Sequence, residues 1–211
     1  MNLIIKPSDI EKKSFSIITQ ELGDRTFPAG QEEVVKRVIH TTADFDYADN
    51  LCFSEDAIES AKDALSHGAT IITDTNMAMS GINKTILSSL GGQVCCFMAD
   101  KQVAEEAKTR GVTRAIVSME HAAKLDGPLI FAIGNAPTAL IRLHELIEQG
   151  VCHPALVVGV PVGFVNVVES KELFIGGTTP YIIARGRKGG SNVAAAIINA
   201  LQYQLVRREG F

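Results

Sequence analysis

Five short apolar runs, each with glycine, proline or polar residues nearby, alternate with helical stretches after Gly68. The runs cover residues 69–73, 93–98, 129–134, 155–160 and 180–184. Near-continuous apolar character is typical of strands buried on both faces, as in parallel sheets whose crossovers are helices. Because such crossovers are right-handed, we predict a three-layer α/β fold with a doubly wound, mainly parallel sheet of about five strands, flavodoxin-like in type.

Helical periodicity accounts for much of the remaining sequence. Three N-terminal helices are predicted before the first strand, at residues 9–22, 30–41 and 54–67. Further helices are predicted between and after the strands, at 81–90, 101–110, 114–124, 136–149, 167–173 and 191–205. No linker, internal repeat or low-complexity segment interrupts this pattern, so residues 1–211 are interpreted as one domain.

Charge and apolar run length argue against several functional classes. The net charge of −4 disfavours bulk nucleic-acid binding. No run approaches the roughly 18 apolar residues of a membrane span, and the N-terminal apolar run is too short for a signal peptide. The four cysteines form no C-x-x-C pair, and buried thiols in a reducing compartment are their plain interpretation. We therefore expect a cytoplasmic protein without membrane or nucleic-acid partners.

The segments that follow the predicted strands are rich in glycine and polar residues. They are 74–77, 134–138, 160–164 and 185–191. Ligands of doubly wound sheets bind beyond the carboxyl ends of the strands, so these segments are expected to converge on one rim. Glycine lets the backbone approach a ligand, and the N–H groups that open a helix attract anions. The sequence therefore predicts a pocket for a ligand with carboxylates or phosphates.

Common cofactor and hydrolase motifs are missing from the sequence. There is no P-loop, no G-x-G-x-x-G after a strand and no G-x-S-x-G. The acidic run 44–55 superficially resembles a calcium loop, but it lacks an oxygen ligand and the glycine where that loop needs them. No two histidines have the spacing of a zinc site. We therefore expect no cofactor and no metal site, and proton-driven isomerisations or rearrangements fit best.

Several segments, in this order and spacing, resemble the precorrin-8X methylmutase family, also called cobalt-precorrin-8 methylmutase. They are Lys13–Phe15, Arg37–His40, Thr73–Met77 with Gly81-Ile82, Ala132–Leu140, Gly159–Val165 with Glu169–Lys171, and Arg185–Ser191. The similarity spans essentially the whole chain. It implies an isomerase of cobalamin biosynthesis that moves a methyl group from carbon 11 to carbon 12 of a corrinoid ring, giving hydrogenobyrinate or its cobalt counterpart, cobyrinate.

The resemblance places the catalytic histidine of the family at His40. Protonation of the macrocycle makes the migration terminus more electron-poor, and histidine suits that task. A histidine that merely fills a helix end near Thr41 and Thr42 is the plain alternative. Arg37 lies one turn earlier on the same helix face, and the resemblance makes it a substrate contact rather than a solvated arginine. Its charge should also keep the pKa of His40 from rising.

Further substrate contacts are predicted in several helices and loops. The resemblance implies Ser14 and Arg114, with Thr113 beside Arg114, and the others lie at helix starts on the rim. The full set is Ser14, Thr113, Arg114, Asn135, Thr138, Arg185, Gly189, Gly190 and Ser191. Plain alternatives remain open: surface positions for Ser14 and Arg114, helix capping for Asn135 and Thr138, and a solvated turn for Arg185 and its basic neighbours Arg187 and Lys188. Structural or surface roles are expected for the other histidines.

The resemblance also implies a homodimer with its pocket near the subunit interface, to which apolar residues 162–168 could contribute. The segment after His40 is more similar to the cobalt-containing branch, although both forms of the substrate stay open. Two alternative functions stay open: a non-catalytic carrier that holds the corrinoid on the same rim, and a nucleotide- or phosphosugar-binding protein. The latter predicts phosphate contacts at Gly189 to Ser191.

Overall fold

The computed structural model describes residues 4–206 and contains one mixed sheet of six strands in the order β1-β6-β5-β4-β2-β3. The strands are β1 (Leu51–Phe53), β2 (Thr70–Thr73), β3 (Gln93–Cys95), β4 (Leu129–Ile133), β5 (Leu156–Gly159) and β6 (Tyr181–Ala184). All five predicted strands are present and parallel, and their spatial order is that of a flavodoxin-like sheet. The predicted fold class is confirmed.

The sixth strand, β1, was not predicted. It pairs antiparallel with β6 at the sheet edge, with Leu51 opposite Ala184 and Phe53 opposite Ile182. Three residues are too few for a periodic signal, and only the distant β6 defines this segment as a strand. β1 therefore raises the count from about five strands to six.

Alternate residues of each strand face opposite helical layers. In β4, Leu129, Phe131 and Ile133 belong to one apolar cluster, whereas Ile130 and Ala132 belong to the other. β2, β4, β5 and β6 are buried along their whole length because helices cover both faces, as their continuous apolar sequence predicts. The edge strands β1 and β3 are only partly buried.

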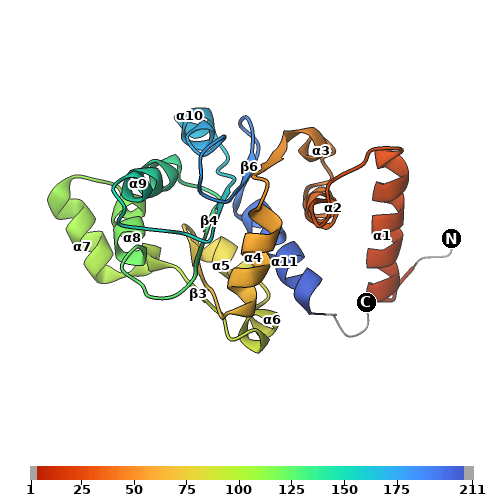
Figure 1. Cartoon of the computed structure of the whole chain (residues 1–211), viewed down its shortest axis with the longest axis horizontal. Coiled ribbons are helices and arrows are strands. Elements are labelled where there is room, and N and C mark those ends of the chain that lie inside the picture. The colour runs from red at the N-terminus through yellow and green to blue at the C-terminus, as the bar shows by residue number, and fades with distance from the viewer. Residues whose placement is uncertain (1–3, 207–211) are drawn as a thin grey trace.

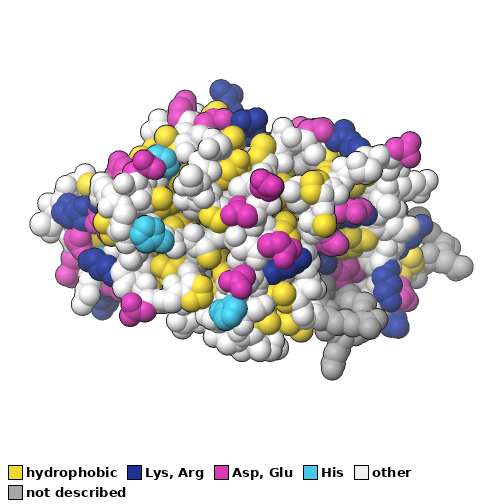
Figure 2. Space-filling view, viewed as in Figure 1, with side chains coloured by type: hydrophobic (Ala, Val, Ile, Leu, Met, Phe, Trp, Pro, Cys, Tyr) yellow, Lys and Arg dark blue, Asp and Glu magenta, His cyan; other side chains and the backbone are white. Residues whose placement is uncertain are grey.

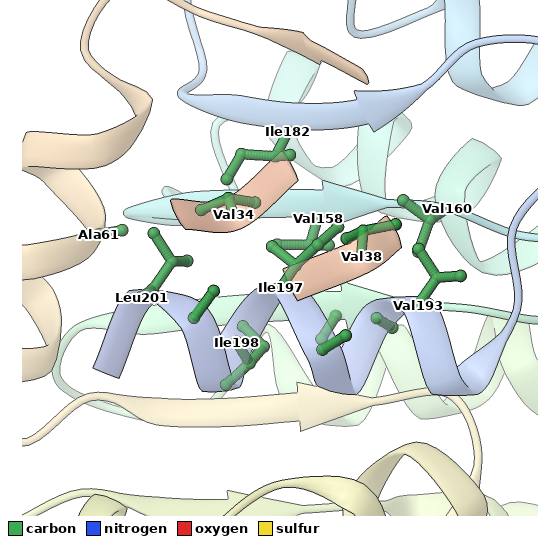
Figure 3. Close-up of a cluster of buried hydrophobic side chains, with 14 of the residues drawn as sticks. Val34, Val38, Ala61, Val158, Val160, Ile182, Val193, Ile197, Ile198 and Leu201 are labelled. Atoms are coloured by element: carbon green, nitrogen blue, oxygen red, sulfur yellow. The ribbon is translucent and has the colours of Figure 1, made fainter. Parts of the chain in front are cut away.

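One face of the sheet is covered by α2 (Gln31–Thr42), α4 (Ala57–Ser66) and α11 (Ser191–Leu205). Figure 3 shows side chains of α2 and α11 meeting those of the strands, with Val34, Val38 and Ile197 near Val158 and Ile182. The other face is covered by α8 (Arg114–Ala122) and α9 (Pro137–Glu148). Helix α7 (Lys101–Arg110) packs outside α8, and α10 (Val167–Glu172) packs beside α9.

Helix α1 (Pro7–Leu22) is the outermost element at one end of the molecule. It packs mainly against α2, and Ile18 and Leu22 reach the core from it. On the face seen in Figure 2, acidic and basic side chains are scattered with hydrophobic ones between them. Within residues 4–206, none of the helices has both the length and the apolar character that crossing a bilayer requires.

The predicted helix 81–90 is wrong in its bounds. Two short helices occur there, α5 (Asn76–Gly81) and α6 (Lys84–Ser89). The side chain of Thr75 accepts a hydrogen bond from the N–H of Ala78, and Asn83 accepts one from Ile86. Each is therefore an N-cap that starts a new helix. The other additions are α3 (Tyr47–Asn50) and a 3-10 turn, Phe97–Ala99, where the strand predicted at 93–98 has already ended.

Candidate functional site

The loops that follow β2 and β4 are joined by the carboxylate of Asp74. This side chain is fully buried and accepts hydrogen bonds from the backbone N–H groups of Gly134 at 2.9 Å, Asn135 at 2.8 Å and Ala136 at 2.6 Å. Burial raises the pKa of Asp74, while the three N–H donors oppose that shift. The alternative capping roles of Asn135 and Thr138 are therefore wrong: Ala136 is the N-cap of α9, no side chain caps this helix there, and Asp74 binds the N–H groups of residues 134–136 at its start.

The remaining loops of the rim also bind one another. The Gly190 N–H donates to Val160 O at 2.8 Å, the Gly163 N–H donates to Arg187 O at 3.2 Å, and the hydroxyls of Thr75 and Ser191 lie 2.7 Å apart. A Cβ on Gly189 would lie 2.0 Å from Val160 O. The predicted convergence of these segments on one rim is confirmed, and the close approach of two backbones requires the glycine at position 189.

His40 lies at the C-terminal end of α2, where α1 crosses it. Its Nδ1 is 2.8 Å from the hydroxyl oxygen of Ser14, and its ring stacks on that of Phe15 with centroids 5.2 Å apart. This contact engages Nδ1, so Nε2 is the ring atom that can meet a ligand. Ser14 is thus not an ordinary helix-surface residue, because it fixes the orientation of the imidazole.

Arg37 is half-buried beside the histidine and is not a solvated arginine. Its guanidinium pairs with Glu11 and lies over the rings of Phe15 at 4.6 Å and Tyr203 at 5.3 Å. The pKa of His40 is lowered by burial and by the charge of Arg37, and Glu11 works in the opposite direction. The expected effect of Arg37 on the pKa of His40 is therefore confirmed in direction.

The imidazole of His40 separates two hollows. The first, about 440 Å³, lies between α1 and α2, and its walls are mainly apolar. The second, about 280 Å³, lies between α2, α5 and α11 and has polar groups in its wall. Residues of the first include Ile10, Ser14, Ile17, Ile39 and Phe45, and those of the second include Arg37, Asn192, Asn199 and Tyr203. A proton on His40 is therefore accessible from a site large enough for organic ligands.

A second group of predicted residues lies on the other face of the sheet. Thr113 caps α8 by accepting from the Ile116 N–H, and its hydroxyl is 3.1 Å from that of Thr138 at the start of α9. Arg114 is exposed and lines a hollow of about 450 Å³ together with Lys108. Because α2 packs on the opposite face, one chain does not bring Arg114 and Thr113 into the wall of the His40 hollows.

The basic residues that follow β6 make separate contacts. Arg185 pairs with Glu172 at 3.3 Å, Arg187 lies 5.5 Å above the ring of Phe164, and Lys188 contacts Asp44 and Asp46 at 2.6 Å each. All three are exposed on the rim beside the start of α11. A ligand carboxylate would therefore have to exchange with Glu172 at Arg185 and with Asp44 and Asp46 at Lys188, whereas Arg187 stacks on an aromatic ring.

Two important residues were not singled out from the sequence. Glu11 lies one turn before Ser14 and Phe15 on α1, so helical spacing alone could have placed it on the same face. Lys171 is buried; it lies in the segment Glu169–Lys171 that carries the family resemblance, but no role was predicted for it. Within residues 4–206, no group of three or more His, Cys, Asp or Glu side chains is arranged to hold a metal ion.

This chain is similar to methylmutases that act on precorrin-8 or cobalt-precorrin-8, as their names state. The family model CbiC, precorrin-8X methylmutase, matches residues 9–204. Cobalt-precorrin-8 methylmutase of Salmonella typhimurium is 47% identical over 213 residues, covering 97% of this chain and 99% of that protein. The Priestia megaterium protein of the same name is 45% identical, covering 94% and 88%. The crystal structure of precorrin-8X methylmutase from Thermus thermophilus aligns with a TM-score of 0.83 and 41% identity, covering 92% of this chain and 95% of that one.

Proposed function

The chain belongs to the precorrin-8X methylmutase family, and from that premise we propose that His40 is the proton donor of its reaction. The protein is an isomerase of cobalamin biosynthesis. Its reaction moves a methyl group from carbon 11 to carbon 12 of a corrinoid. The cobalt-containing form is the proposed substrate, because the Salmonella and Priestia relatives carry that name.

The proposal for His40 is carried by one observation: its ring is held in place and lines both hollows at the junction of α1 and α2. Ser14 engages Nδ1 and directs Nε2 toward bound substrate. The lowered pKa of His40 makes its protonated form a stronger acid, which favours transfer of the proton to the macrocycle. The added positive charge draws electrons from the ring system and promotes methyl migration.

Arg37 is proposed to bind a peripheral carboxylate of the substrate. Its guanidinium already pairs with a carboxylate, that of Glu11, and a substrate carboxylate would have to exchange with it or share it. The rings of Phe15 and Tyr203 hold the cation in place during this exchange.

His40→Ala tests the catalytic assignment and separates an isomerase from a carrier. Anaerobic incubation with cobalt-precorrin-8, and separately with precorrin-8, is followed by absorption spectroscopy. We expect turnover to be lost while the corrinoid product still binds. His67→Ala is the matched control, because His67 is an exposed residue at the end of α4. Full turnover by His40→Ala would remove His40 as the acid, and pigment binding without turnover by the wild type would favour the carrier.

We further propose that the protein acts as a homodimer in the cytoplasm and that each site is completed by the second subunit. Two features support this. Arg114 begins a helix that packs on the opposite face of the sheet from α2, which carries His40. The loop before α10 exposes Val162, Phe164 and Val165, and 83% of Phe164 is accessible, which is unusual for an isolated surface.

Mixing inactive variants tests this arrangement. His40→Ala and Arg114→Ala are each expected to be inactive, and a refolded equimolar mixture should regain about a quarter of the wild-type activity, because half of the pairs are mixed and each has one intact site. Light scattering at micromolar concentration gives the mass. A monomeric mass would remove the homodimer, and a dimeric mass without recovered activity would place each site within one chain.

A further inference from the structure

Lys171, on α10, is a fully buried lysine that the proposed reaction does not use. It is 0% exposed, and its Nζ donates hydrogen bonds to the carbonyl oxygens of Gly186 and Lys188, each at 2.8 Å. Both acceptors are backbone groups of the loop between β6 and α11. Burial lowers its pKa to about 8. Lysine is seldom fully buried, so this position requires a specific reason.

The reason lies in the shape of the loop 185–189. Three successive carbonyls of this loop, those of Gly186, Arg187 and Lys188, accept hydrogen bonds from the body of the protein. Lys171 supplies two of these bonds, and the Gly163 N–H supplies the middle one. With its carbonyls held in this way, the loop exposes the side chains of Arg187 and Lys188. Glu172, next to Lys171, adds a contact to Arg185.

We propose that Lys171 is a positioning residue for substrate recognition: it fixes the backbone of loop 185–189 so that its cations meet the peripheral carboxylates of the corrinoid. Arg187 does so directly, and Arg185 and Lys188 do so in exchange for their present partners Glu172, Asp44 and Asp46. The proposal rests on the proposed function, which supplies a ligand with several carboxylates. Lys171 itself does not touch substrate. Its ammonium group acts through two carbonyl oxygens, which it ties to α10.

The chemistry explains why lysine is needed. One lysine nitrogen carries several N–H donors and can bind two carbonyls that point toward the same place. Methionine has a similar length and packs well, but it donates nothing. In Lys171→Met the two carbonyls would turn toward water, because buried polar groups without partners are costly. The side chains of Arg185, Arg187 and Lys188, which the same loop carries, would then move away from their present positions.

The test compares binding with turnover at saturation. Lys171→Met, Lys171→Arg and the surface control Lys101→Met are assayed for kcat and KM on cobalt-precorrin-8 and titrated with the corrin product. Lys101 is exposed at the start of α7, away from this loop. For Lys171→Met we expect KM and the product Kd to rise on the order of tenfold, as for the loss of one charge-assisted contact, with kcat changed by less than about twofold. Lys171→Arg should restore part of this loss.

A purely structural role makes a different prediction. It would lower the melting temperature and the folded fraction of Lys171→Met, but KM and Kd per folded molecule would stay at the wild-type values, and this result would overturn the proposal. If Lys171→Met does not fold, Lys171→Gln, which keeps an N–H₂ donor, replaces it in the same assays.

A double-mutant cycle with Arg187→Gln connects Lys171 to the loop. If Lys171 acts through the loop cations, Lys171→Met should weaken product binding less in the Arg187→Gln background than in the wild type. Additive effects would contradict this. Failure of the proposed function is distinguishable, because a wild type that converts neither form of precorrin-8 removes the reaction, whereas the product titrations still compare Lys171→Met with the wild type.

Discussion

Replacing Asp74 by alanine should destabilise the protein strongly, although this residue lies outside the His40 hollows. In the folded protein its carboxylate is the acceptor for three N–H groups, of which that of Gly134 is fully buried. A net contribution of about 1 kcal/mol for each hydrogen bond gives about 3 kcal/mol. The cost of burying the carboxylate, which also raises its pKa, is removed at the same time and reduces the expected loss to about 2 kcal/mol.

Urea unfolding followed by circular dichroism measures this loss. With a slope of about 2 kcal/mol per molar urea, the midpoint of Asp74→Ala should fall by about 1 M while the slope stays the same. Asp49→Ala is the matched control, because its carboxylate is exposed and makes a surface pair with Arg25; its midpoint should change by less than about 0.25 M. A wild-type midpoint for Asp74→Ala would refute the view that one carboxylate joins the loops after β2 and β4.

Two further outcomes follow from the site and the rim. In the folded protein the pKa of His40 lies below its usual 6.5, so as the pH falls the unfolded chain takes up this proton before the folded protein does. Acidification from pH 6.5 toward the folded pKa should therefore lower the free energy of unfolding. Over the same pH range protonated His40 accumulates, so kcat/KM should rise. Because Glu11 raises the pKa of His40, Glu11→Gln should move this rise in kcat/KM to lower pH. A move to higher pH would contradict the role given to Glu11. Gly189→Ala should destabilise the protein by about 3 kcal/mol or more in thermal unfolding, because the new Cβ would meet Val160 O. The control Gly111→Ala, with φ of 65° and no atom within 4 Å of the new Cβ, should cost only about 1 kcal/mol. Equal losses for the two variants would show that the protein relieves the close approach at position 189 easily.

The sequence was most informative where a pattern is local. The five parallel strands are continuous apolar runs, and their helices have regular apolar spacing, so the layers of the fold could be predicted. β1 could not, since three residues become a strand only by pairing with β6. The start of α5 depends on the capping side chain of Thr75, and the break before α6 depends on that of Asn83, which lies inside a stretch with helical composition.

The candidate site shows the same division. His40 and Ser14 were predicted from the family resemblance, and they are in contact. The pairing of Glu11 with Arg37 joins residues 26 positions apart, and it depends on how α1 crosses α2. Lys171 has the sequence context of an exposed helical lysine, because α10 is short and half of its residues are exposed. Its burial follows from the position of the loop after β6, which is a property of the whole fold.

Helix α1 supplies Ser14, Phe15 and Glu11 to the site, yet it is fastened to the rest of the protein mainly through α2. Segments with few core contacts open at a smaller energetic cost than the central strands. On warming, α1 should therefore detach and the enzyme should lose activity at a temperature at which the sheet is still folded. Cooling should restore the activity. We therefore expect loss of activity and unfolding of the sheet at two different temperatures, the lower one set by α1.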